Sequence, residues 1–252
     1  MSDIKLKRKS IRVVTGPMAS GKTKVFENLL NRAYIANQPV LSFTSTKDSD
    51  AKRRTIKSRD GDYVPIDYEI DSLDHLIKHV EDYLRPIEKE YTQLTAELIT
   101  NPKSKKLKTK LSVVKRKMNL VVLADEVQFY DQGTEYLTIR KYLKKIIEIS
   151  LKGPQFIFFG LNLTHELYVY KIVCLLAGIS DEFIIRTALC EWCGKEGAKY
   201  SKKIKDVVGS YDAGKDKYFP ACDKCYYNPK MDFPFLQKRW KKTKKRKKCK
   251  VI

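Results

Sequence analysis

A glycine-rich segment near the start of the chain constrains the fold more than any other feature. Residues 16–23 read Gly-Pro-Met-Ala-Ser-Gly-Lys-Thr, which fits the phosphate-loop pattern G-x-x-x-x-G-K-[ST]. The two glycines allow a tight turn whose backbone N–H groups point inward, and no Cβ keeps a triphosphate at a distance. A strand is predicted over 11–15 and a helix over 24–36, whose N-terminal dipole favours an anion. The alternative is a chance match in an ordinary glycine turn.

The phosphate-loop pattern also predicts individual roles. Lys22 would reach the β- and γ-phosphates of ATP, and the Thr23 hydroxyl would reach a magnesium ion. The residues predicted to bind ATP are Gly16, Pro17, Met18, Ala19, Ser20, Gly21, Lys22 and Thr23.

The positive charge of the chain is concentrated in two segments. The net charge is +21, and residues 103–117 carry eight Lys and Arg while residues 239–250 carry nine. Neither segment contains an acid, so the remainder of the chain is close to neutral. Such runs are usually solvated and disordered. The alternative prediction is that they bind polyanions weakly or act as a localisation signal.

Composition also indicates the compartment. No apolar run reaches the roughly 18 residues of a membrane span, and the basic residues at 1–9 have no apolar core after them. We therefore predict a cytoplasmic protein without a membrane partner. In that reducing compartment, six cysteines favour a metal site or free thiols over disulfides.

Strand and helix patterns alternate along the chain. This alternation is typical of an α/β fold: a phosphate-loop NTPase-like parallel sheet flanked by helices. Helix formers and then lysines fill 85–117, which predicts a helical insert with a basic loop. The other predicted elements are strands over 39–45, 64–70, 119–124, 154–160 and 183–185, and helices over 71–84, 134–152 and 164–177. The helix that begins near 71 is expected to end before Pro86.

Two carboxylates follow the most apolar of these strands. Residues 119–124 lead directly into Asp125 and Glu126, as a buried parallel strand would at the active edge of a sheet. Asp125 is predicted to hold, with Thr23, the magnesium of the bound nucleotide. The alternative is a strand that merely ends in a polar loop.

Four cysteines form two C-x-x-C pairs, a spacing typical of a zinc site. They are Cys190, Cys193, Cys222 and Cys225. Four thiolates complete a tetrahedron without an open position, so the zinc would be structural, one per chain. Unliganded thiols are the alternative. The intervening residues predict a hairpin whose tip could close over a ligand.

In combination, these motifs resemble those of the type II thymidine kinases of cells, bacteria and poxviruses. The resemblance covers roughly residues 10–80 and 119–227, and rests on the phosphate loop, the segment 125–129, Gly160-Leu161-Asn162, and the cysteine pairs with Tyr218. It implies transfer of the γ-phosphate of ATP to the 5′-hydroxyl of thymidine or deoxyuridine. It also implies inhibition by thymidine triphosphate and a homotetramer.

The same resemblance implies residue roles. Glu126 matches the family's catalytic carboxylate, which accepts the proton of the hydroxyl. The expected nucleoside-binding residues are Met18, Asp50, Phe129, Leu161, His165, Ser201, Val207, Val208, Gly209 and Tyr218. The chain departs from the family pattern at His165, usually a phenylalanine, at Asn162, commonly an aspartate, and at Leu167, usually basic. These departures bear on base preference.

The motifs divide the chain into three predicted parts. Residues 1–187 form a phosphate-loop kinase domain, residues 188–236 a small zinc-anchored lasso domain, and residues 237–252 a basic tail, expected to be disordered. Two other functions fit part of the pattern. One is a phosphate-loop ATPase that acts on nucleic acid, and the other is a zinc-containing binding module that has lost catalysis. The intact phosphate loop, with Lys22 and Thr23, and the two carboxylates Asp125 and Glu126 argue against the binding module.

Overall fold

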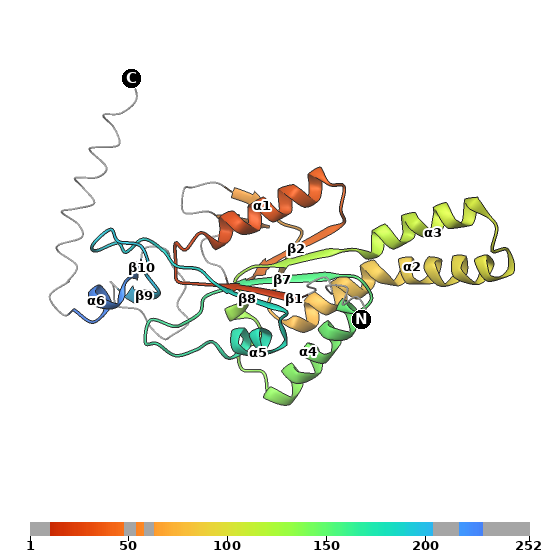
Figure 1. Ribbon diagram of the computed structural model, residues 1–252. Helices are drawn as coiled ribbons and strands as arrows, with labels where there is room; N and C mark the ends of the chain where they lie inside the picture. Colours follow the sequence, from red (N-terminus) through yellow and green to blue (C-terminus); the bar gives the residue numbers. More distant parts are fainter. Residues whose placement is uncertain (1–10, 48–53, 58–62, 204–216, 229–252) are drawn as a thin grey trace, which may run out of the picture.

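A six-stranded parallel sheet forms the centre of the protein (Figure 1). The computed structural model describes residues 11–47, 54–57, 63–203 and 217–228. The strand order is β5-β2-β6-β7-β1-β8, and each neighbouring pair is parallel. The strands are β1 (Ile11–Thr15), β2 (Val40–Ser45), β5 (Tyr68–Ile70), β6 (Val121–Ala124), β7 (Gln155–Gly160) and β8 (Glu182–Ile185). This sheet confirms the predicted fold class.

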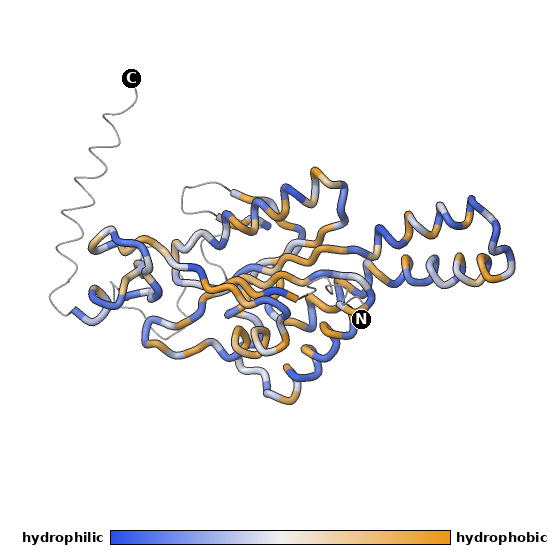
Figure 2. The backbone as a smooth tube through the Cα atoms, in the orientation of Figure 1, coloured by the Kyte–Doolittle hydropathy of each residue, from blue (hydrophilic) through white to orange (hydrophobic). Residues whose placement is uncertain are grey.

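Helices cover both faces of the sheet, so its central strands are buried on both sides (Figure 1). On β7, Phe156 and Phe158 face one core while Ile157 and Phe159 face the other, as alternation along a strand requires. This double burial explains why these strands read as mainly apolar runs in the sequence and appear mostly orange in Figure 2. The helices are α1 (Lys22–Ile35), α2 (Leu73–Thr100), α3 (Lys105–Met118), α4 (Tyr136–Ser150) and α5 (Lys171–Ile179).

Helix α2 continues through Pro86, so the prediction that it ends near Leu84 was wrong. A proline within a helix costs about 3 kcal/mol. Apolar side chains nevertheless recur at helical spacing on both sides of it, and Leu84, Ile87 and Leu94 are all buried. At about 1.5–3 kcal/mol for each large apolar side chain, their burial outweighs the cost of the proline.

Helix α3 replaces the basic loop that was expected within residues 103–117. Ser104 caps it by accepting a hydrogen bond from the Leu107 N–H at 3.3 Å. Val114 is buried against α2, and Leu107 and Leu111 are partly buried beside it, so the two helices share a small core (Figure 1). The lysines therefore occupy the outer surface of a helix, because the apolar residues between them have helical spacing.

Two further predicted elements differ in the structure. Residues 164–170 are not helical, because the Thr164 hydroxyl accepts hydrogen bonds from the N–H groups of Glu166 and Tyr168, and α5 begins only at Lys171. The strand expected over 64–70 is divided in two. Its first part, β4 (Tyr63–Pro65), pairs with β3 (Thr55–Lys57), and its second part is β5 of the main sheet.

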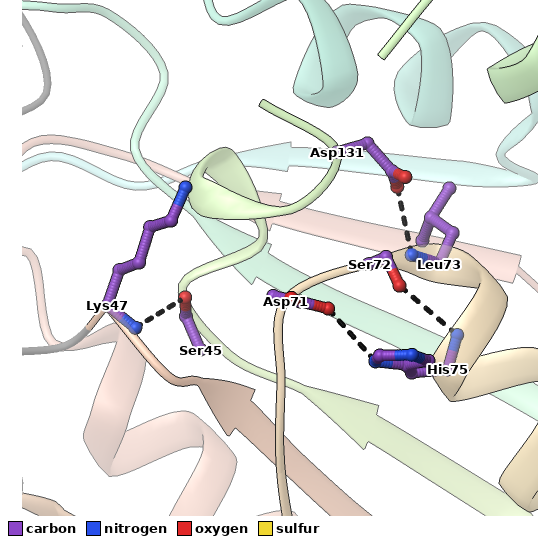
Figure 3. Close-up of polar contacts among 7 residues, drawn as sticks. All are labelled: Ser45, Lys47, Asp71, Ser72, Leu73, His75 and Asp131. Atoms are coloured by element: carbon purple, nitrogen blue, oxygen red, sulfur yellow. Dashed lines mark hydrogen bonds and ion pairs between the residues drawn. The ribbon is translucent and has the colours of Figure 1, made fainter. Parts of the chain in front are cut away.

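The loop after β6 is fastened to the start of α2 (Figure 3). Asp131 accepts a hydrogen bond from the Leu73 N–H at 2.9 Å, while Ser72 accepts one from the His75 N–H. Burial raises the pKa of Asp131, and the Leu73 hydrogen bond opposes that rise. His75 also lies 2.9 Å from Asp71. The Asp131–Leu73 hydrogen bond thus ties the chain to α2 just after the short helix η1 (Val127–Phe129), which follows the two carboxylates.

A small module follows the sheet and contains the antiparallel strands β9 (Tyr200–Lys203) and β10 (Tyr218–Ala221) and the short helix α6 (Asp223–Tyr226). The predicted hairpin is thus confirmed at its base. Its tip, with Val207, Val208 and Gly209, lies outside the described residues, as do Asp50 and the predicted tail at 237–252. In the described part of the chain, no helix combines the length and the apolar character needed to cross a membrane.

Candidate functional site

The predicted phosphate loop joins β1 to α1, as the pattern requires. Gly16 has φ 153° and Gly21 has φ 78°, both in the region that favours glycine. A Cβ at Gly16 would lie 2.5 Å from the Arg186 carbonyl oxygen, so no larger residue fits there. Gly21 directly precedes the first turn of α1, which brings the positive end of that helix to the loop.

Lys22 lies inside the loop, with its side chain folded back over the turn. Its Nζ donates to the carbonyl oxygens of Gly16 at 3.1 Å and Pro17 at 2.9 Å. Burial lowers the pKa of Lys22, and the nearby Glu126 and Asp125 raise it. The lysine and both predicted carboxylates therefore lie close enough to interact electrostatically, as a shared nucleotide site requires.

Asp125 and Glu126 lie at the end of β6, at the sheet edge that carries the loop. Asp125 is 1% exposed, and its N–H donates to the Phe43 carbonyl at 2.9 Å, which extends the β2–β6 pairing. Glu126 has φ 53°, a left-handed conformation that a residue with a Cβ rarely adopts. Such strain is common at functional sites. Here it ends the strand and turns the chain into η1.

Gln128 connects Glu126 to the neighbouring strand. Its side-chain Nε2 donates to the Glu126 carboxylate, and its Oε1 accepts a hydrogen bond from the Leu161 N–H at 3.0 Å. Gly160 makes room for it, since a Cβ there would lie 2.9 Å from that Oε1. Gln128 therefore sets the orientation of the Glu126 carboxylate.

The described nucleoside-binding candidates lie between the loop and the β9–β10 hairpin. The Met18 N–H donates to the Ser201 hydroxyl at 3.1 Å, which joins the loop to β9. The rings of His165 and Tyr218 are 5.5 Å apart. Leu161 is placed beside Glu126 by Gln128, and Phe129 is buried in η1. The structure thus joins Met18 to Ser201 and His165 to Tyr218, while Leu161 and Phe129 both adjoin Gln128, the residue that contacts Glu126.

The four predicted cysteine ligands form one cluster. Their Sγ atoms all lie within 4.8 Å of one another, and those of Cys193 and Cys222 are 3.7 Å apart. Tetrahedral zinc, with Zn–S bonds of about 2.3 Å, needs sulfurs separated by about this distance. The donor set and its geometry therefore fit zinc.

The cysteine thiols have opposed pKa shifts. Burial raises the pKa of Cys190, but hydrogen bonds from the backbone of Cys222, Cys193 and Trp192 lower it to a net value of about 7. Burial and the other three thiols raise the pKa of Cys225. Without a cation, the cluster would thus keep some thiols protonated, and a bound zinc would favour four thiolates.

Hydrogen bonds near the cysteine cluster join the hairpin module to the sheet domain. The Tyr226 hydroxyl, next to Cys225, donates to the His165 carbonyl at 2.5 Å. The Asn162 side-chain amide donates to the Lys199 carbonyl at 3.4 Å. Together with the contact between Met18 and Ser201, these bonds place the hairpin over the carboxyl edge of the sheet.

Two residues of the site were not identified as functional from the sequence. Gln128 lies in a motif that was recognised. Its contact with Leu161 could not be predicted, because Leu161 follows β7, which is far from Gln128 in the sequence although it lies next to β6 in the sheet. Arg186 follows the edge strand β8, and its Nε donates to the Ser20 carbonyl at 2.8 Å. A basic residue directly after a predicted strand was the one available signal.

A phosphate loop and two carboxylates at the carboxyl edge of one parallel sheet define a nucleotide-binding α/β protein of the phosphate-loop class. The family model described as thymidine kinase matches residues 9–88 and 85–226. Because these matches cover most of the chain, the protein belongs to the thymidine kinase family. The predicted resemblance is confirmed.

Individual relatives agree with this assignment. A thymidine kinase of Amsacta moorei entomopoxvirus is 22% identical over 219 residues, which cover 87% of this chain and 98% of that protein. A thymidine kinase of Pseudothermotoga lettingae is 33% identical over 106 residues. These residues cover 42% of this chain and 53% of that protein. Among solved structures, the genome packaging NTPase B204 of Sulfolobus turreted icosahedral virus 2, in complex with sulfate, covers 71% of this chain and 74% of its own. Its identity of 13% and TM-score of 0.35 are too low to bear on function.

Removal of one cysteine ligand tests the zinc site. We expect about one zinc per chain by elemental analysis, and Cys222→Ser should lose it, melt at a lower temperature and bind thymidine more weakly. Cys174→Ser, an exposed cysteine on α5, is the matched control and should change none of these properties. A Cys222→Ser protein with parental zinc content and melting temperature would contradict the assignment.

Proposed function

We propose that this protein is a thymidine kinase that transfers the γ-phosphate of ATP to the 5′-hydroxyl of thymidine, giving thymidine monophosphate and ADP in nucleotide salvage. Deoxyuridine is the alternative acceptor. The observation that carries the proposal is the position of Glu126. Its carboxylate is oriented by Gln128 and interacts electrostatically with Lys22, and the phosphate loop that contains Lys22 is joined to the β9–β10 hairpin.

Each residue has a chemical task in this reaction. The loop N–H groups and Lys22 would bind the phosphates. Lys22 would then give up its hydrogen bonds to the Gly16 and Pro17 carbonyl oxygens and donate to phosphate oxygens instead. Thr23 and Asp125 would hold magnesium, whose charge offsets that of the phosphates. Glu126 would accept the proton of the 5′-hydroxyl and orient its attack. A zinc ion held by the four cysteines would have no open ligand position, so it would support the hairpin and take no part in the phosphate transfer.

The remaining expectations concern the nucleoside and the assembly. Met18, Phe129, Leu161, His165, Ser201 and Tyr218 would surround the nucleoside, and Asp50 and 207–209 would complete the site. Family membership supports inhibition by thymidine triphosphate, a homotetramer and a place in the cytoplasm. His165 supplies an imidazole whose Nδ1 is buried without a hydrogen-bond partner among the described residues. Because that atom could bind a base edge, the range of accepted bases is the property we expect to differ most within the family.

A nucleoside panel tests the proposed function. ADP formation should require a pyrimidine deoxynucleoside and be fastest with thymidine or deoxyuridine. ADP formed at the same rate without any nucleoside would instead indicate a phosphate-loop ATPase, and nucleic acid should then stimulate it.

Glu126→Gln tests the proposed base. The amide keeps the size of the side chain but cannot accept a proton, so turnover should fall at least about 100-fold, while ATP affinity stays nearly unchanged. Glu148→Gln, the same change at an exposed site on α4, is the control and should be neutral. Near-normal turnover of Glu126→Gln would remove Glu126 from this role. Lys22→Ala should differ by weakening ATP binding itself.

We also propose that α3 binds polyanions such as duplex DNA. All eight basic residues of 103–117 are exposed, and those in the first turn of α3 oppose the helix dipole, which costs stability unless an anion offsets it. Within the described residues, Lys117 of α3 forms an ion pair with Glu90 of α2, and the two charged groups are 3.9 Å apart.

The salt dependence of DNA binding tests this surface. Changing Lys105, Lys106, Lys108 and Lys110 to Gln should reduce the slope of log affinity against log salt by about 0.9 for each phosphate that the variant no longer neutralises. Thymidine turnover should stay within about twofold, since α3 contributes no residue to the proposed site. Lys141→Gln with Lys144→Gln, exposed on α4, is the control. An unchanged slope in the α3 variant would exclude this surface.

A further inference from the structure

Arg186 is held beside the phosphate loop by the sheet itself. Strand β8 pairs with β1 in parallel, with Ile185 opposite Thr15. The next residue, Arg186, extends this pairing, because its N–H donates to the Thr15 carbonyl at 2.7 Å. Its backbone position is therefore fixed where β1 enters the loop. The close approach of its carbonyl oxygen to Gly16 shows how tightly the two segments pack.

The Arg186 side chain contacts the middle of the loop. Its Nε donates to the Ser20 carbonyl at 2.8 Å, and its Nη2 lies 3.6 Å from the position that a Cβ would take at Gly21. The guanidinium thus lies over the peptide that joins these two residues. This contact crosses 166 positions of sequence, so it belongs to the tertiary fold and not to the local turn.

The contact fixes the direction of one N–H group. The structure shows no cis peptide bond among the described residues, so the Ser20–Gly21 peptide is trans. In a trans peptide, the carbonyl and the following N–H point in opposite directions. Because Arg186 binds the Ser20 carbonyl, the Gly21 N–H must point away from Arg186. In a phosphate loop, such inward N–H groups bind the phosphates.

We propose that Arg186 is a positioning residue for the phosphate loop, which holds the Ser20–Gly21 peptide so that the Gly21 N–H faces the nucleotide phosphate. Arginine suits this task because its Nε and terminal nitrogens form a rigid, permanently charged group. Its charge also acts on the site, since Arg186 adds to the lowering of the Lys22 pKa that burial causes. The proposal needs a nucleotide phosphate, but it does not depend on the nucleoside that the enzyme phosphorylates.

Direct binding of ADP, measured by calorimetry without nucleoside, tests this role. Arg186→Gln should weaken ADP binding about tenfold to 100-fold, the range for loss of a hydrogen bond from a charged group. Arg186→Lys keeps the charge without the fork geometry and should show a smaller loss. The affinity for thymidine should not change in either variant. Added guanidinium ion should restore part of the ADP affinity of Arg186→Ala, which a general loss of folding would not allow.

Arg12→Gln is the matched control. Arg12 lies on the same strand pair, where its Nε is 3.2 Å from Glu182, but at the end away from the loop. We expect ADP affinity within about twofold of the parent, since this change leaves the Arg186 hydrogen bond to the loop intact. The proposal is wrong if Arg186→Gln and Arg186→Lys both bind ADP like the parent, or if thymidine affinity falls equally. Because ADP binding is measured alone, failure of the thymidine kinase proposal would leave this result interpretable.

Discussion

Parallel pairing of β6, β7 and β1 is the constraint on which the site depends. Ala124 of β6 pairs with Phe158, and Thr15 of β1 pairs with Gly160. This register brings the end of β6, from which the chain continues into Asp125 and Glu126, to the edge where β1 ends at Thr15, the last residue before the loop. A parallel sheet places all carboxyl ends at one edge, so residues far apart in the sequence meet there. Pairing in another register would separate the loop from the carboxylates.

The conformation at this edge is held by a few specific contacts. Glu126 has a left-handed backbone, which costs about 1–3 kcal/mol. Hydrogen bonds to charged groups contribute about 1.5–3 kcal/mol each, so the bond from Gln128 is comparable to that cost. The space that Gly160 leaves lets Gln128 contact Glu126 and Leu161 at once. Together, these contacts support a carboxylate in one fixed orientation.

The parts of the fold that depend on local pattern could be predicted from the sequence. The phosphate loop, Asp125 and Glu126, and the four cysteines each have a spacing that follows from their chemistry, and the structure brings each group together. The extent of α2 could not be predicted, because Pro86 is outweighed by packing against α3, a helix that was itself read as a loop. Arg186 and Gln128 were missed because their contacts lie across the sheet. The roles assigned to Asp50 and 207–209 stay predictions, since these residues lie outside the described part of the chain.

Following the γ-phosphate of ATP into its products tests most directly the central claim, that the site transfers phosphate to a nucleoside. The protein would be incubated with ATP labelled at the γ-phosphate, magnesium and thymidine, and the labelled products separated. If the site transfers phosphate to a nucleoside, the label appears in thymidine monophosphate and little appears in inorganic phosphate. Label found only in inorganic phosphate, in equal amounts with and without thymidine, would contradict the account.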